Sequence, residues 1–514
     1  MMPFTNQTYF DFTKKENFDL QKEALAKVNA QLGKEYPNII GGKSVFSEKK
    51  TKSINPANPA EIIGVFQKSG KDQAEEAIQT AWKTFQTWQY FPAEERAKFL
   101  FKAAEVCKKR RFEINAWMIK EVGKNFAEAD ADTAEAIDFL EFYGREMIRY
   151  SQSQPLTPYT QEYNEYFYIP LGVGVIVPPW NFPFAIMVGM TSAAIVTGNT
   201  VVLKPSSDSP MMAYLFAEIM KEVGLPDGVL NFLVASGAEA GDYLVDHPKT
   251  RFVAFTGSVA TGTRINERAA KVNAGQIWLK RVIAEMGGKD TLIVDSETPS
   301  IDAAVNATVV SAYGFQGQKC SACSRVVVDE KIYDEFVEKL VKQVKELPIG
   351  SPEDNVRFGP VVSASAEATV LEYIDIAKKE GKILTGGNKL DRPGYFIEPT
   401  VVADLAIDSR ISLEEIFGPV LAVFKAKDFD EALAIANNTS FGLTGGVFTL
   451  NREKLIKAKK HFHVGNLYFN RKITGAIVDV HPFGGFNMSG TDSKAGSRDY
   501  LLLFMQGKSV TELL

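Results

Sequence analysis

Short apolar runs alternate with helix-like segments in the middle of the chain, and this alternation constrains the fold more than any other feature. The apolar runs occupy residues 172–177, 200–205, 229–234 and 251–257. Helical segments at 184–196 and 210–223 lie between them. Strands that alternate with helices of this length form βαβ units, which build parallel sheets. The sequence therefore predicts a doubly wound α/β domain.

A second series of the same kind begins after Gly287 and Gly288. Its apolar runs are residues 291–295, 324–329 and 418–426, and its clearest helix is 333–347. We therefore predict two α/β domains joined near the glycine pair. Residues 1–150 are rich in Lys, Glu and Ala, so we predict that they form a helical layer on the first domain.

Composition excludes several classes of protein. Among 514 residues, 58 Lys and Arg stand against 63 Asp and Glu, for a net charge of −5. A nucleic-acid-binding protein normally carries a basic excess, so no nucleic-acid partner is expected. Three cysteines form no disulfide framework, and the first residues lack a basic segment followed by an apolar run. Together these features predict a cytoplasmic protein.

Residues 166–203 contain no charged side chain, which raises the question of a membrane span. Prolines 170, 178, 179 and 183 interrupt the first half of this stretch. The remainder is too short to cross a bilayer with room for tilt. Buried strands of a parallel sheet read as continuous apolar runs, so we expect no membrane contact.

Cys320, in the segment FQGQKCSACS, is a candidate nucleophile. A neighbouring cation lowers the pKa of a thiol, and Lys319 adjoins it. Two other interpretations stay open: a buried structural cysteine, and a redox pair or reversible disulfide with Cys323. The four histidines have no ligand spacing to this pair, so no metal site is expected.

Two further residues could act on a carbonyl group. Glu285 ends an apolar run just before the glycine pair, where burial could raise the pKa of its carboxyl for general base catalysis. Asn181 lies in the rigid segment PPWNFPF, where its amide could stabilise an oxyanion. An ordinary strand-end carboxylate and a turn asparagine are the alternatives.

Several strand ends could bind a dinucleotide. The segment Gly237–Gly241 has the spacing GxxxG, which is a weak phosphate fingerprint. Gly257 and Ser258 end another strand before a helix, and Lys204 ends a third. Ligands of open α/β sheets bind at such carboxyl ends.

Taken together, these segments resemble the aldehyde dehydrogenase superfamily over nearly the whole chain. The matching blocks, in the family's order, are VPPWNFPF, VVLKPSSDSP, FTGS, EMGGKD, GQKCSA, EEIFGPV and PFGGFNMSG. The segments YGFQGQKCSA, AEAIDF and RKITGAIV are similar to the branch of the family that oxidises L-glutamate γ-semialdehyde. That reaction belongs to proline and arginine catabolism and yields glutamate.

The resemblance implies a role for each candidate. Cys320 would be the nucleophile and Glu285 the base, and Asn181 would form the oxyanion hole with the Cys320 backbone N–H. The expected cofactor contacts are Pro179, Trp180, Lys204, Ser207, Gly241, Gly257, Ser258, Glu415 and Phe417. Many NAD-preferring relatives carry Glu at the position of Ser207, so we expect NAD with measurable use of NADP.

The resemblance also implies how an amino-acid aldehyde would bind. Its carboxylate would contact Lys319, Ser321 and the backbone N–H groups of Gly475 and Ala476. Glu135 would lie near the ammonium. The aromatic rings expected on both sides of the aliphatic chain are those of Phe184 and Phe483.

The family fold comprises two parallel-sheet α/β domains and a small β oligomerisation flap. It implies a Rossmann-like NAD(P)-binding domain at 1–154 and 171–286, and a catalytic domain at 287–490. Residues 155–170, expected as a hairpin, and the tail 491–514 would pair between subunits, so a homodimer is the minimum. Another semialdehyde substrate and a non-catalytic protein on the same fold remain alternatives.

Overall fold

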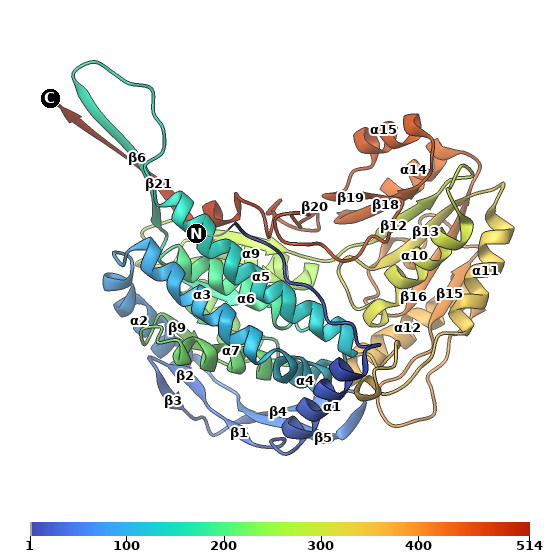
Figure 1. Cartoon of the computed structure of the whole chain (residues 1–514), viewed down its shortest axis with the longest axis horizontal. Coiled ribbons are helices and arrows are strands. Elements are labelled where there is room, and N and C mark those ends of the chain that lie inside the picture. Colours follow the sequence, from blue (N-terminus) through green and yellow to red (C-terminus); the bar gives the residue numbers. More distant parts are fainter. Residues whose placement is uncertain (1–2) are drawn as a thin grey trace.

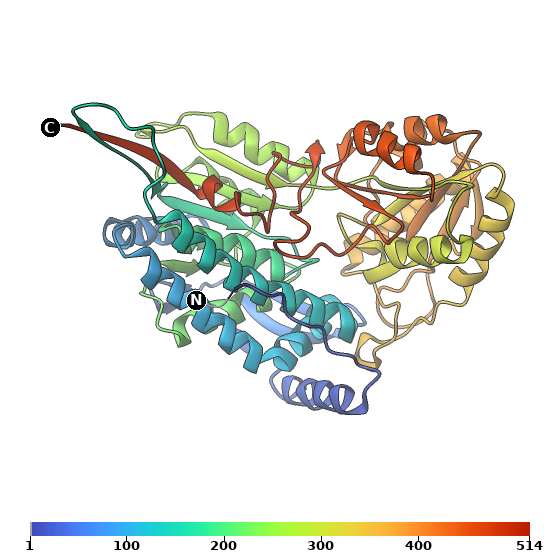
Figure 2. The same cartoon turned by 45° about the horizontal axis from the view of Figure 1, so that its top comes forward.

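Two seven-stranded sheets, each in its own lobe, organise the computed structural model, which describes residues 3–514 (Figures 1 and 2). The first sheet has the strand order β11-β10-β7-β8-β9-β2-β3. Its parallel strands are β7 (Val173–Val177), β8 (Thr200–Leu203), β9 (Leu230–Phe232), β10 (Thr250–Thr256) and β11 (Arg281–Glu285). Helices α6 (Ala185–Val196) and α7 (Pro210–Glu222) connect its central strands. The predicted parallel α/β architecture is confirmed.

The second sheet has the order β14-β15-β16-β13-β12-β18-β19 and is parallel except for β14. Its strands are β12 (Asp290–Val294), β13 (Cys323–Asp329), β14 (Lys382–Thr385), β15 (Thr400–Ala403), β16 (Val420–Ala426), β18 (Thr444–Phe448) and β19 (Asn466–Phe469). Its helices are α10 (Ile301–Tyr313), α11 (Tyr333–Lys345), α12 (Ala364–Glu380), α14 (Phe429–Asn437) and α15 (Arg452–His461). The chain passes from one sheet to the other across Gly287 and Gly288, between β11 and β12.

The N-terminal region is not the purely helical layer that its composition suggested. Helices are present: α1 (Lys15–Asn29), α2 (Lys71–Trp88), α3 (Ala93–Lys109), α4 (Arg111–Val122) and α5 (Phe126–Tyr150). Between α1 and α2, however, β1 (Glu35–Tyr36), β4 (Lys50–Asn55) and β5 (Asn58–Gln67) form a third sheet. The antiparallel strands β2 (Asn38–Ile40) and β3 (Lys43–Val45) extend the first sheet.

A glycine pair explains the β2–β3 hairpin. Gly41 and Gly42 form its two-residue turn, with φ values of 57° and 75°. Two consecutive left-handed residues are what the tightest hairpin turn requires, and glycine adopts them without steric cost. This Gly-Gly pair was the sequence signal for the missed strands.

A two-stranded flap projects from the first lobe (Figure 1). The sequence suggested a hairpin within 155–170, but strand β6 (Glu162–Pro170) does not form one. It pairs antiparallel with β21 (Met505–Leu513) at the other end of the chain. The turn η4 (Tyr500–Phe504), just before β21, is buried in the core of the first lobe.

Among residues 3–514, no helix combines the length and the apolar character needed to cross a membrane.

Candidate active site

The candidate residues of the first lobe follow the carboxyl ends of neighbouring parallel strands. Asn181 follows β7, Lys204 follows β8, Ser258 follows β10, and Glu285 ends β11. Strand β7 lies between β8 and β10 in the sheet. After β7 the chain adds β8 and β9 on one side of it, and then adds β10 and β11 on the other side. Such a topological switch point is where open α/β sheets bind ligands.

A left-handed turn delivers Cys320 to this edge from the second lobe. Phe315, Gln316 and Gly317 have φ values of 50°, 56° and 70°. A Cβ atom on Gly317 would lie 2.4 Å from the carbonyl oxygen of Gly418, so only glycine fits there. Cys320 lies just before β13, at the amino edge of the second sheet. This edge faces the carboxyl edge of the first sheet, because residues from both edges line one cavity.

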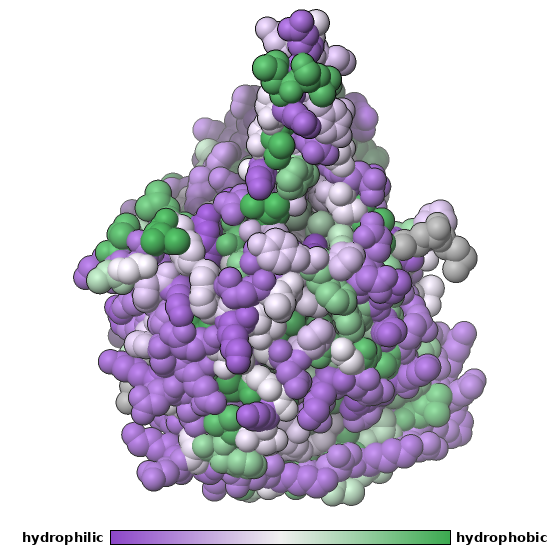
Figure 3. All heavy atoms as spheres, turned by 90° about the vertical axis from the view of Figure 1, so that its left-hand side faces the viewer, coloured by the Kyte–Doolittle hydropathy of each residue, from purple (hydrophilic) through white to green (hydrophobic). Residues whose placement is uncertain are grey.

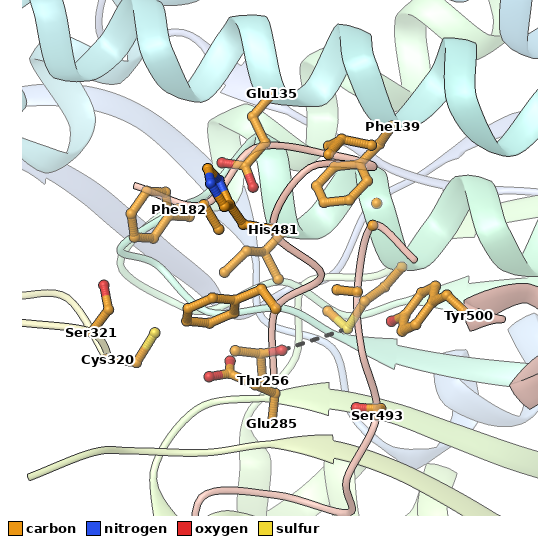
Figure 4. A pocket seen from close by; sticks show the side chains of 18 of the residues that line it. Glu135, Phe139, Phe182, Thr256, Glu285, Cys320, Ser321, His481, Ser493 and Tyr500 are labelled. Atoms are coloured by element: carbon orange, nitrogen blue, oxygen red, sulfur yellow. Dashed lines mark hydrogen bonds between the residues drawn. The ribbon is translucent and has the colours of Figure 1, made fainter. Parts of the chain in front are cut away.

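Cys320 and Glu285 line the same cavity and lie beside one another (Figure 4). Burial raises the pKa of the Glu285 carboxyl to about 8, and the negative charge of Glu415 adds to the shift. Its Oε1 atom is buried with no hydrogen-bond partner among residues 3–514. A carboxyl with these properties suits proton transfer near neutral pH.

Lys319 does not activate Cys320, contrary to the prediction from their adjacency. Its ammonium pairs with the carboxylate of Glu128, with Nζ 2.7 Å from Oε2. Burial raises the pKa of the Cys320 thiol well above its usual value, and the charges of Glu285 and Asp290 raise it further. A thiol whose pKa is raised is mostly protonated near neutral pH, so its activation requires a base.

Asn181 ties the loop after β7 to the segment that carries Cys320. The residue is 3% exposed, and its Nδ2 atom donates to the carbonyl oxygen of Gln318 at 3.0 Å. An amide nitrogen carries two hydrogens, and this bond uses one of them. The side chain is thus fixed beside the nucleophile with one donor left for a ligand.

Lys204 and Gly241 form the end of the candidate cofactor site next to β8. Burial lowers the pKa of the Lys204 ammonium to about 8. A Cβ atom on Gly241 would lie 3.6 Å from the Lys204 side chain, so the two residues are neighbours. Ser207, in the turn that follows, is exposed.

The start of helix α9 (Val259–Ala270) supplies the next part. Ser258 is its N-cap, and the Ser258 hydroxyl accepts a hydrogen bond from the Thr261 N–H at 3.3 Å. The Gly257 N–H donates to the carbonyl oxygen of Glu285 at 3.1 Å. A helix N-terminus with free backbone N–H groups attracts phosphate.

Glu415 and Phe417 come from the second lobe. The Glu415 carboxylate accepts from the Gly288 N–H at 3.0 Å. It lies so close to Gly287 that a Cβ atom there would stand 2.0 Å from it. Phe417 meets Trp180 edge to face, with ring centroids 5.5 Å apart, and Trp180 follows Pro179 in the loop after β7.

The cavity around Cys320 contains most of the predicted substrate contacts. Its lining includes Glu135, Ser321, Gly475, Ala476 and Phe483. Gly475 has a φ of 80°, a left-handed conformation that glycine favours. Lys319 is not among the lining residues.

Phe184 was predicted to contact the substrate, but it lies elsewhere. It is fully buried and packs edge to face against Phe216, 6.2 Å away. Phe182, two residues earlier, lines the cavity instead. In the segment WNFPF the prolyl turn reverses which aromatic ring faces the site, and spacing alone could not decide this.

Further lining residues were missed by sequence reasoning. Phe139 and Tyr143 follow Glu135 at intervals of four residues, so the helical period of α5 was an available signal. His481 also lines the cavity. Its Nε2 atom lies 3.5 Å from the Arg471 guanidinium, and its buried Nδ1 atom has no partner among residues 3–514.

Cys323 is separate from this cavity. It begins β13, is 1% exposed, and donates through Sγ to the carbonyl oxygen of Arg325 at 3.2 Å. Burial raises the pKa of its thiol to about 12. A buried, protonated thiol is a poor partner for thiol–disulfide exchange. Within residues 3–514, no three His, Cys, Asp or Glu side chains gather as a metal site.

Known proteins that are similar to this chain in sequence and structure identify its family. Residues 45–510 match the model of the aldehyde dehydrogenase family. The 1-pyrroline-5-carboxylate dehydrogenases of Geobacillus thermodenitrificans and Anoxybacillus flavithermus are 56% and 57% identical, over 100% of both chains. A crystal structure of 1-pyrroline-5-carboxylate dehydrogenase from Thermus with bound NAD has a TM-score of 0.99 and 48% identity, covering 100% of both chains. The chain therefore belongs to the aldehyde dehydrogenase family.

Proposed function

We propose that this protein oxidises L-glutamate γ-semialdehyde, formed by hydrolysis of 1-pyrroline-5-carboxylate, to L-glutamate with NAD. One observation carries the proposal: a single cavity holds Cys320 and Glu285 together with Glu135 and the backbone at 475–476. The first pair suits aldehyde oxidation, and the second set suits the charged end of an amino acid. The full-length relatives named for this reaction support the same substrate.

The residues at the strand ends fit NAD. Lys204 and Glu415 would hold the two riboses, and the α9 N-terminus with Ser258 would face the pyrophosphate. Trp180 and Phe417 supply aromatic walls. Bound NAD would accept the hydride that leaves the substrate carbon.

Cys320 attacks the aldehyde carbon in the first step. Because its thiol is protonated in the free protein, a base must remove the proton, and Glu285 is beside it. The oxyanion that forms accepts hydrogen bonds from the Asn181 amide and the Cys320 backbone N–H. Each such donor contributes about 3 kcal/mol to the transition state.

Glu285 acts again when the resulting thioester is hydrolysed. Once the proton taken from Cys320 has passed to solvent, its carboxylate takes a proton from water, which attacks the thioester carbon and releases the Cys320 thiolate and the acid. A pKa of about 8 makes Glu285 a stronger base than an exposed carboxylate, which matches this task.

The amino-acid end of the substrate binds in the same cavity as the aldehyde. The Ser321 hydroxyl and the N–H groups of Gly475 and Ala476 hold its carboxylate, because successive backbone N–H groups form an anion-binding concavity. Glu135 faces the ammonium. Phe182, in place of Phe184, and Phe483 pack on the aliphatic chain.

NADP is a second, weaker cofactor in this proposal. Ser207 is exposed and uncharged where a glutamate would repel a 2′-phosphate. We expect a measurable kcat/KM with NADP, below that with NAD. Complete rejection of NADP would contradict this role of Ser207.

We also propose a cytoplasmic location, because three free cysteines are typical of a reducing compartment.

The flap supports the proposal that the protein forms at least a homodimer. Figure 3 shows hydrophobic residues toward the tip of the flap. In its two strands, Tyr163 is 54% exposed and Leu513 is 78% exposed. Exposed apolar edges of this kind usually mark an interface.

Steady-state rates with 1-pyrroline-5-carboxylate and with propanal test the substrate. The wild type should strongly prefer the former. Ser321→Ala should raise KM for 1-pyrroline-5-carboxylate by about ten-fold, the value of one hydrogen bond to a charged group, and leave propanal unaffected. Equal effects on both substrates would contradict the carboxylate contact.

A further inference from the structure

Residues 3–12, here called the strap, run in extended form along α5 (Figures 1 and 2). The Phe4 ring packs on Phe142, and the Phe12 ring packs on Phe126. The strap is thus antiparallel to the helix. Eight extended residues span about 27 Å, and sixteen helical residues rise about 24 Å, so the two lengths match.

Asn6 is the residue of this strap that reaches the substrate-binding loop. Its Nδ2 atom donates to Asp138 Oδ2 on α5 at 3.1 Å, and also to the carbonyl oxygen of Val478 at 3.0 Å. One amide group therefore joins α5 to the loop that carries residues 475–476. The adjacent Gln7 N–H donates to Asp138 Oδ1 at 2.8 Å, which fixes the carboxylate that Asn6 contacts.

Both ends of this bridge adjoin proposed substrate contacts. Asp138 lies one helical turn after Glu135, and Val478 lies two residues after Ala476. Glu135, Ala476 and Val478 all line the cavity. The distance between the ammonium site and the carboxylate site therefore depends on how the loop is held against α5.

The rest of the strap anchors this bridge without touching the cavity. The Phe10 N–H donates to Asp130 at 2.8 Å, and the Arg111 guanidinium donates to the carbonyl oxygen of Thr8 at 3.0 Å. Asp138 and Val478 are 5% and 3% exposed, so water cannot readily replace Asn6 between them. The strap lies outside residues 45–510, the range that the family model matches.

We propose that Asn6 is a positioning residue that sets specificity for the amino-acid substrate. Its amide clamps the 473–479 loop onto α5 and so holds the two charged ends of the substrate at the correct separation. This role rests on the proposed function. Chemistry at the aldehyde does not depend on the clamp, because Cys320, Asn181 and Glu285 are held by other elements.

Asn6→Leu tests the clamp, since leucine is similar in size and has no donor. Gln7→Ala is the matched control, because Gln7 contacts Asp138 through its backbone N–H, which alanine retains. For each variant, kcat and KM are measured with 1-pyrroline-5-carboxylate and with propanal, beside the midpoint of thermal unfolding.

We expect Asn6→Leu to raise KM for 1-pyrroline-5-carboxylate about ten-fold, as for loss of a hydrogen bond to a charged group, with little change for propanal. Gln7→Ala should resemble the wild type. An unchanged KM, or equal losses with both substrates, would overturn the clamp alone. A wild type that oxidises propanal but not 1-pyrroline-5-carboxylate would overturn the proposed function and the clamp with it.

Discussion

At the scale of single residues, burial of ionisable groups shapes the candidate site. The pKa of Glu285 is raised to about 8 and that of Glu415 to about 7, whereas that of Lys204 is lowered to about 8. Desolvation is the largest cause in each case, because it disfavours the charged form. The site thus holds groups that exchange protons in the physiological range.

The pH dependence of the rate should report Glu285. A base must be deprotonated to act, so kcat/KM should rise with pH through about 8, the pKa of this carboxyl. The measurement is a pH–rate profile for the wild type and for Glu285→Gln. The variant should lose most activity, and its residual rate should lack this rise. An identical profile in both proteins would assign the rise to another group.

The two phenylalanines of WNFPF should behave differently when truncated. Phe184→Ala should lower the free energy of unfolding by about 3–5 kcal/mol, because it opens a cavity in a packed core. Phe182→Ala should raise KM for the substrate by about ten-fold with a smaller loss of stability. Denaturant unfolding measures the free energy of unfolding of both variants, and steady-state kinetics measure their KM. The reverse pattern would restore Phe184 to the site.

Residue types made Cys320, Glu285 and Asn181 candidates for a nucleophile, a base and an oxyanion donor, and the resemblance to aldehyde dehydrogenases assigned them these roles. Which aromatic ring faces the cavity depends on backbone direction in a prolyl loop, so Phe184 was predicted where Phe182 lies. The pKa of the Cys320 thiol depends on burial and on charges from distant segments, among them Glu285 and Glu415. The neighbouring Lys319 is paired with Glu128, which is also distant in the sequence. Adjacency in sequence could not reveal that pair.

At the scale of secondary structure, buried parallel strands were the easiest elements to predict. Strands β7, β8, β10 and β13 each contain a continuous apolar run, since both faces of a parallel sheet are covered. Strands β1, β4 and β5 carry mixed polar patterns, and β2 and β3 have only three residues each, so all five were missed. The β6–β21 pair joins segments more than 300 residues apart, a separation that local patterns do not encode.

The flap gives a prediction at this scale. Deleting residues 506–514 removes most of β21 but keeps Phe504 and Met505, which are buried in the core. We expect light scattering to show a smaller oligomer than the wild type, with the midpoint of thermal unfolding of the subunit little changed. An unchanged mass would show that the flap does not hold subunits together.

At the scale of the whole molecule, the proposed catalytic residues come from both seven-stranded sheets. The carboxyl edge of the first sheet carries Asn181, Lys204 and Glu285, and the amino edge of the second carries Cys320. The base and the nucleophile therefore meet only when the lobes are joined, and the Gly287–Gly288 connection runs between them. The N-terminal strap adds a third element to the same site through Asn6.

The central claim is that the protein oxidises a semialdehyde with NAD through a covalent adduct on Cys320, while it holds the substrate by its amino-acid end. The most direct measurement is formation of NADH from 1-pyrroline-5-carboxylate by the wild type and by Cys320→Ala, with propanal as the comparison aldehyde. We predict strong preference for 1-pyrroline-5-carboxylate in the wild type and no activity on either compound in the variant. Turnover that persists in Cys320→Ala, or a wild type that leaves 1-pyrroline-5-carboxylate unchanged, would contradict it.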